Sequence, residues 1–128
     1  MSNYLFVYGT LTRTNEPNFA LILNKLKYIG SGKILGKMYD LGEYPGVIEN
    51  NEKYVYGEIY QIHDLKMLSA IDEYEEVDHI EPQKGLYIRK ITNAILDQGK
   101  EMQVFVYFYN KSIKNMKEIP SGKWNENN

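Results

Sequence analysis

Residues 64–76, DLKMLSAIDEYEE, combine a helical pattern of apolar residues with a run of acids at its end. At about 100° per residue, a helix beginning near Asp64 gathers its apolar side chains on one arc: Leu65, Met67, Leu68 and Ile71. One further turn places Glu75 near the middle of that arc and leaves Glu73 and Glu76 on wetter faces. The pattern therefore predicts a short amphipathic helix that directs one carboxylate towards the core.

A carboxylate in that position has more than one interpretation. An ionised carboxylate facing a core is costly unless it is paired or its pKa is raised, so Glu75 is either half of a structural ion pair or a proton-transfer group. The alternative is that the helix ends at Tyr74 and the glutamates form a solvated surface turn. The helical periodicity alone favours neither interpretation.

The composition limits the class of protein. The 128 residues, 43% hydrophobic and 25% charged, suit a single domain over 1–128. A net charge of −2 argues against nucleic-acid or membrane-surface partners, and the absence of cysteine excludes disulfides and thiol nucleophiles. The N-terminus lacks a signal-peptide pattern, and no segment approaches the roughly 18 apolar residues of a membrane span. We therefore expect a soluble, cytoplasmic protein.

The order of the expected elements predicts the fold class. The continuously apolar residues 4–8 predict a strand buried on both faces in the middle of a sheet, and 18–27 predict a helix. Further strands are expected over 28–41 with bends at its glycines, from 47, over 54–62, and as a hairpin over 86–96 and 102–109. This order predicts an α+β fold: a small, mixed, mostly antiparallel β-barrel with two or so flanking helices, followed by a flexible tail from about residue 112.

The loop after the first strand is a candidate binding site. Tyr8, Gly9, Thr10 and Leu11 leave a buried strand, and a glycine there lets consecutive backbone N–H groups approach a carboxylate or phosphate. Arg13 supports an anion site. The alternative is a tight turn that binds no ligand, with Arg13 as a solvated loop residue.

Two tyrosines on the later strands are further candidates. A hydroxyl of Tyr87 or Tyr107 could orient a substrate or hold the carboxylate of Glu75, although ordinary core packing also explains either residue. The pairs His63-Asp64 and Asp78-His79 lack helical ligand spacing, so no metal site is expected. Nucleotide-binding and serine-hydrolase motifs are absent from the sequence.

Several short motifs together resemble the gamma-glutamylcyclotransferase-like family, which includes the AIG2-like and gamma-glutamylamine cyclotransferase proteins. The similar segments are YGTL at 8–11, YDLG and YPG at 39–42 and 44–46, IDEYE at 71–75, GLYIR at 85–89, VY at 106–107 and PSGKW at 120–124. No single segment is specific, but their order and spacing are, and they extend over nearly the whole chain.

The resemblance implies a fold and a reaction. It implies a small β-barrel with a cavity at one end, where the α-amine of a γ-glutamyl compound attacks its own γ-carbonyl to give 5-oxoproline and a free amine without a cofactor. By position, Glu75 would be the general acid/base, and backbone groups of Gly9, Thr10 and Leu11 would bind the α-carboxylate and amine of this small-molecule substrate. We expect a monomer or a weak homodimer.

One departure from the family pattern concerns Glu76. The family usually has a small residue or glycine after the catalytic glutamate, and a second carboxylate here could raise the pKa of the first or discourage an anionic substrate. Two other functions stay open at this point: a non-catalytic binding module on the same fold, and a hydrolase that would release free glutamate rather than 5-oxoproline.

Overall fold

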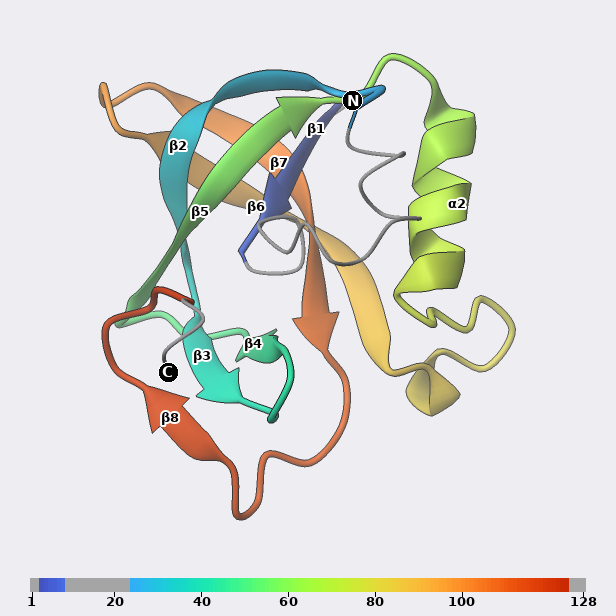
Figure 1. Cartoon of the computed structure of the whole chain (residues 1–128), viewed down its shortest axis with the longest axis vertical. Coiled ribbons are helices and arrows are strands. Elements are labelled where there is room, and N and C mark those ends of the chain that lie inside the picture. Colours follow the sequence, from blue (N-terminus) through green and yellow to red (C-terminus); the bar gives the residue numbers. More distant parts are fainter. Residues whose placement is uncertain (1–2, 9–23, 125–128) are drawn as a thin grey trace.

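Five strands form a closed barrel in the order β1-β5-β2-β6-β7 (Figure 1). The computed structural model describes residues 3–8 and 24–124. The barrel strands are β1 (Tyr4–Val7), β2 (Lys27–Leu35), β5 (Tyr54–Gln61), β6 (Tyr87–Leu96) and β7 (Glu101–Tyr109). Neighbouring strands are antiparallel except β1 and β7, which close the barrel in parallel. The predicted mixed, mostly antiparallel barrel of the α+β class is confirmed.

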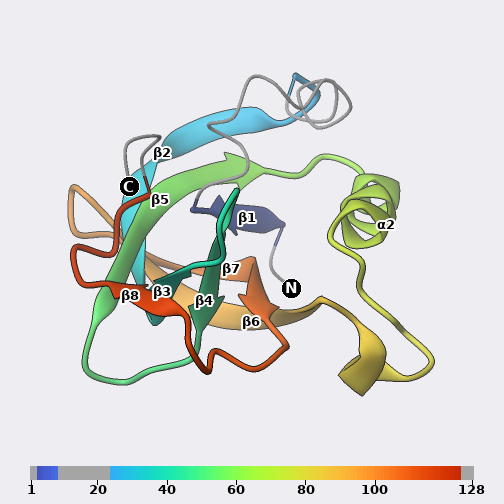
Figure 2. The same cartoon turned by 60° about the horizontal axis from the view of Figure 1, so that its bottom comes forward.

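A second, three-stranded sheet lies at one end of the barrel, where Figure 2 brings it forward. It contains β3 (Lys37–Asp40), β4 (Pro45–Ile48) and β8 (Lys117–Ile119), in the order β4-β3-β8. We expected a flexible tail from about residue 112, yet β8 lies within that segment and pairs antiparallel with β3. A strand of three residues is too short to show an alternating pattern in the sequence.

Strand β1 separates two hydrophobic cores. Leu5 and Phe6 are each only 1% exposed and, as successive strand residues, point to opposite faces. Phe6 packs in the barrel interior, and Leu5 packs in the layer between the barrel and the helix. Because β1 pairs with both β5 and β7, the prediction of a central strand buried on both faces is confirmed.

Two sequence-based boundaries were wrong: the strand expected from residue 47 begins at Pro45, because Pro45 and Gly46 already pair with β3, and a second error lies near residue 27. The hairpin of β6 and β7 is confirmed. The bend expected in the 28–41 segment is also confirmed, because Gly36 interrupts the strand between β2 and β3. The helix predicted over 18–27 lies largely outside the described residues. Its last part was predicted wrongly, because residues 24–26 form a turn and Lys27 already pairs with Gln61 of β5.

Helix α2 (Leu65–Tyr74) packs along the side of the barrel (Figure 1). Its N-cap is Asp64, whose side chain accepts a hydrogen bond from the Lys66 N–H. The described residues contain this one α-helix together with a 3-10 turn, η2 (Pro82–Lys84). Leu68 and Ile71 are buried as expected, whereas Leu65 is 50% exposed. The predicted amphipathic helix therefore forms, with an apolar face narrower than the sequence pattern suggested.

The helix ends in a turn that a glycine would suit better than a glutamate. The Glu76 N–H donates to the Glu73 carbonyl at 3.2 Å, and the Val77 N–H donates to the Asp72 carbonyl at 3.0 Å. This pair of bonds defines a Schellman motif with Glu76 at the left-handed position, where its φ is +56°. A side chain at that position strains the backbone, and glycine would relieve this strain.

We expect the free energy of unfolding of Glu76→Gly to be about 1 kcal/mol higher than that of Glu76→Ala. Both changes remove the charge of Glu76, but only glycine relieves the left-handed strain, so the difference between the two variants isolates the backbone effect. Urea denaturation of both proteins gives the free energies of unfolding. Equal stabilities would show that the left-handed turn is not maintained in solution.

Candidate active site

Glu75 is the C-cap residue of α2, and the turn described above fixes its position. The helix ends at Tyr74, and the Glu75 N–H donates to the Ile71 carbonyl at 2.8 Å. Glu75 is half-buried, whereas Glu73 and Glu76 are exposed. The alternative of a solvated turn is therefore correct about where the helix ends but wrong for Glu75 itself.

The surroundings of Glu75 favour its protonated form. Burial, followed by the neighbouring negative charge of Glu76, raises the pKa of Glu75 to about 7. A carboxyl group with this pKa exchanges its proton readily at neutral pH, as a general acid/base must. The sequence-based hypothesis that Glu76 raises the pKa of Glu75 agrees with this direction.

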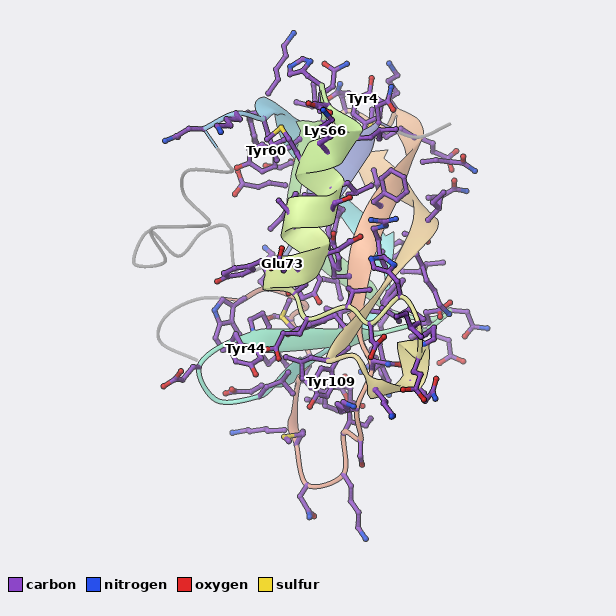
Figure 3. All side chains as sticks on the ribbon, turned by 90° about the vertical axis from the view of Figure 1, so that its right-hand side faces the viewer. Tyr4, Tyr44, Tyr60, Lys66, Glu73 and Tyr109 are labelled. Carbon is purple, nitrogen blue, oxygen red and sulfur yellow. The ribbon has the colours of Figure 1, made fainter. Side chains whose placement is uncertain are left out.

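Tyrosines from separate segments lie close enough to Glu75 to sense its charge. Desolvation, then the nearby Tyr87 and the charge of Glu75, raise the pKa of Tyr8 at the end of β1. Desolvation, then Tyr109 and nearby acids that include Glu75, raise the pKa of Tyr44 in the loop between β3 and β4. Figure 3 shows Tyr44 and Tyr109 beyond the end of α2 that carries Glu73. The charge of Glu75 thus interacts with tyrosines from β1 and from the β3–β4 loop, and with that of Glu76.

The two tyrosine candidates place their hydroxyls on different acceptors. The Tyr87 hydroxyl donates to the Pro45 carbonyl at 3.0 Å, which ties β6 to the small sheet. The Tyr107 hydroxyl donates to Oδ1 of Asp72 at 2.5 Å, so the carboxylate it holds is Asp72. Tyr87 also stacks edge-on against Tyr109, with ring centroids 5.7 Å apart.

The loop candidates lie outside the described residues. These are Gly9, Thr10, Leu11 and Arg13, so their binding role stays a prediction. Tyr8, the last described residue before them, donates its hydroxyl to the Tyr107 carbonyl at 2.5 Å. The chain therefore enters the candidate loop at a residue that lies near Glu75.

Asp72 is a buried acid that the sequence analysis did not single out. It is 3% exposed, and its carboxylate accepts hydrogen bonds from the Arg89 guanidinium and the Tyr107 hydroxyl. His79 Nε2 lies 3.1 Å from Oδ2 of the same carboxylate. The available signal was positional, because Asp72 follows Leu68 by four residues and so lies on the buried face of α2.

A family model described as "Gamma-glutamyl cyclotransferase, AIG2-like" matches residues 5–126, which is nearly the whole chain. The chain belongs to this family. As a member of the gamma-glutamyl cyclotransferase family, it is a cyclotransferase-like enzyme. The resemblance inferred from short motifs is thereby confirmed.

Curated relatives and solved structures of the family agree with this assignment. A putative gamma-glutamylcyclotransferase of Methanocaldococcus jannaschii is 38% identical over 112 residues, covering 85% of this chain and 86% of the relative. The solution structure of the protein ytfP from Escherichia coli has a TM-score of 0.68 at 26% identity and covers 97% of both chains. The crystal structure of YkqA from Bacillus subtilis has a TM-score of 0.71 at 28% identity. The match covers 97% of this chain and 40% of the longer YkqA chain.

The part of the chain that the structure describes contains no helix long and apolar enough to cross a membrane.

The raised pKa of Glu75 predicts how stability depends on pH. The folded state binds the Glu75 proton more tightly than the unfolded state does. The contribution of Glu75 to the free energy of unfolding is therefore greatest below about pH 4.5 and is lost as the pH rises through about 7. The difference between the pKa of Glu75 in the unfolded and folded states corresponds to at most roughly 3 kcal/mol in the free energy of unfolding. Glu75→Gln should therefore be more stable than wild type above pH 7, and the two should converge near pH 4.5.

Urea denaturation of wild type and Glu75→Gln between pH 4.5 and 8 measures this difference. Glu73→Gln, which changes an exposed acid on the same helix, is the matched control and should follow the wild-type profile. A constant difference between Glu75→Gln and wild type over the whole range would show that the pKa of Glu75 is not raised in the folded state.

Proposed function

We propose that this enzyme is a γ-glutamyl cyclotransferase that converts a γ-glutamyl compound into 5-oxoproline and a free amine, with Glu75 as general acid/base. The observation that carries the proposal is a half-buried carboxyl group whose pKa is raised to about 7, held at a fixed helix end. Membership of the gamma-glutamyl cyclotransferase family supports the reaction class.

The reaction makes one bond and breaks another within one molecule. The α-nitrogen of the glutamyl group forms a bond to its own γ-carbonyl carbon, closing a five-membered ring, and the bond from that carbon to the leaving nitrogen breaks. The α-nitrogen loses two protons as it changes from an ammonium group to the lactam N–H, and the leaving nitrogen gains two, so the amine is released in its ammonium form. No oxidant, reductant or water is consumed.

Glu75 can accept and return protons because its pKa lies near neutral pH. Its ionised form accepts a proton of the α-ammonium group, and the resulting carboxylic acid returns a proton to the departing amine. General acid–base catalysis of this kind contributes a rate factor of roughly 10² to 10⁴. A further part of the barrier is removed by holding the glutamyl chain curled so that amine and carbonyl meet.

The glutamyl end of the substrate is assigned to the segment that follows β1. Backbone N–H groups of Gly9, Thr10 and Leu11 would bind its α-carboxylate, as the sequence predicts. Tyr8, the residue that directly precedes this segment, supports the assignment. Burial, then Tyr87 and the charge of Glu75, raise the pKa of Tyr8. The hydroxyls of Tyr8 and Tyr87 would limit the orientation of the substrate beside the acid/base.

The test is turnover of a panel of γ-glutamyl amino acids, γ-glutamyl amines and ε-(γ-glutamyl)lysine, followed by mass spectrometry. We expect 5-oxoproline from at least one compound, with kcat reduced by about 10² or more in Glu75→Gln because the amide cannot exchange a proton. Glu73→Gln should stay within a factor of about 3. Release of glutamate would identify a hydrolase, and normal turnover by Glu75→Gln would exclude the mechanism.

Glu76 should set the pH at which the enzyme becomes active. Since its charge adds to the raised pKa of Glu75, Glu76→Gln should lower that pKa and move the ascending limb of the kcat/KM profile to lower pH. The limb reports Glu75 because the ionised form begins the reaction. An unchanged profile would mean that the two carboxylates do not interact in the free enzyme.

A further inference from the structure

We propose that Asp72 is a positioning residue for Glu75, and that it acts through its contacts with Arg89 and Tyr107. The proposal deepens the function proposed above, on which its kinetic test rests. Asp72 lies three residues before Glu75, in the last turn of α2, and its buried carboxylate is hydrogen-bonded to the Tyr107 hydroxyl.

The first step is the way in which the Asp72 carboxylate is held. It is buried; Arg89 on β6 and Tyr107 on β7 donate hydrogen bonds to it, and His79 Nε2 in the loop after α2 lies 3.1 Å from Oδ2. Arg89 and Tyr107 pair with each other across the β6–β7 hairpin, so the carboxylate is fixed to two adjacent strands. The last turn of α2 is therefore attached to the barrel wall by a charge-assisted contact.

The second step is the link from Asp72 to the backbone of Glu75. The Asp72 carbonyl accepts the Val77 N–H at 3.0 Å, which closes the turn around Glu75 and Glu76. Residues three apart in a helix share a face, so a side chain anchored at 72 fixes the side from which residue 75 emerges. Both the side chain and the backbone of Asp72 thus restrict the direction of Glu75.

The third step is a second connection through Tyr107. Its hydroxyl donates to Asp72, while its backbone carbonyl accepts the hydroxyl of Tyr8. Alongside burial, the charge of Glu75 in turn contributes to the raised pKa of Tyr8. A displacement of Tyr107 would therefore disturb the acid/base from the helix side and from the β1 side at once.

A purely structural role does not require this arrangement. Buried ion pairs often add little stability relative to well-packed apolar residues, because desolvation offsets the attraction. An ion pair does provide direction, and general acid–base catalysis depends on placing the carboxyl group within hydrogen-bond reach of the moving proton. The contacts of Asp72 supply that direction to the helix end that carries Glu75.

The experiment uses two variants of the full chain. Tyr107→Phe removes only the hydroxyl that holds Asp72 and leaves the ring and the backbone carbonyl in place, while Asp72→Asn removes the charge. Tyr28→Phe is the matched tyrosine control, since its hydroxyl contacts Ser31 on β2. Asp64→Asn is the matched carboxylate control at the other end of α2.

Two quantities are measured in each variant: the pKa of Glu75, by NMR titration of ¹³C-labelled glutamate assigned against Glu75→Gln, and the kinetic constants. Among the described residues, the titratable groups that interact electrostatically with Glu75 are Glu76, Tyr8 and Tyr44, and none of them is changed in these variants. Once its anchor is lost, Glu75 should gain access to water, so its pKa should fall towards the ordinary glutamate value.

We expect Tyr107→Phe to lower the pKa of Glu75 and to reduce kcat by about 10-fold, with KM within a factor of about 3, because misplacement affects the chemical step. Both controls should match wild type in both measurements. A folded Tyr107→Phe variant with unchanged Glu75 pKa and kcat would overturn the proposal. Unfolding of both test variants would also overturn it, since Asp72 would then serve the fold as a whole.

Failure of this proposal is distinguishable from failure of the proposed function. If wild type forms no 5-oxoproline, the cyclotransferase mechanism is wrong, and the NMR titration still decides whether Asp72 positions Glu75. If the wild-type enzyme forms 5-oxoproline but the pKa of Glu75 is unchanged in Tyr107→Phe, the proposed function stands and the positioning role of Asp72 is rejected.

Discussion

The arrangement of the candidate site depends on one buried carboxylate, Asp72, at the junction between α2 and the barrel. An ionised side chain that is 4% exposed destabilises a protein unless it has a charged or hydrogen-bonding partner. Arg89 and Tyr107 supply such partners from neighbouring strands of one hairpin. The requirement to satisfy Asp72 therefore fixes the C-terminal turn of the helix against the barrel, and the position of Glu75 follows from it.

Asp72 and Glu75 lie at the same helix end but in different chemical environments. Asp72 has a guanidinium group and a phenol as donors, whereas the groups described around Glu75 are another acid and tyrosines. The first environment favours a fixed, hydrogen-bonded side chain, and the second raises the pKa of Glu75 to about 7. The two carboxyl groups at this helix end therefore differ in their partners, although they lie only three residues apart.

Sequence patterns predicted the features that depend on local periodicity. The apolar run of β1, the β6–β7 hairpin and the amphipathic α2 all have such patterns, and they are enough to predict a mostly antiparallel barrel. They also singled out Glu75, because it continues the apolar arc. The role of Asp72 could not be read in this way, since its donors Arg89 and Tyr107 lie 17 and 35 residues further along the chain. Periodicity shows that a position is buried, but only tertiary structure shows which donors meet it.

Glu76 links the stability of this helix end to its chemistry. Its φ of +56° places a β-carbon where the Schellman turn favours glycine, and its charge raises the pKa of Glu75. Both effects destabilise the folded state at neutral pH, so stability alone would select a different residue. Strained or electrostatically unfavourable positions persist in proteins mainly where function uses them. In the described part of the chain, the strain and the repulsion coincide beside an acid whose pKa is raised to about 7, so under the proposed mechanism Glu76 serves the proton transfer rather than the fold.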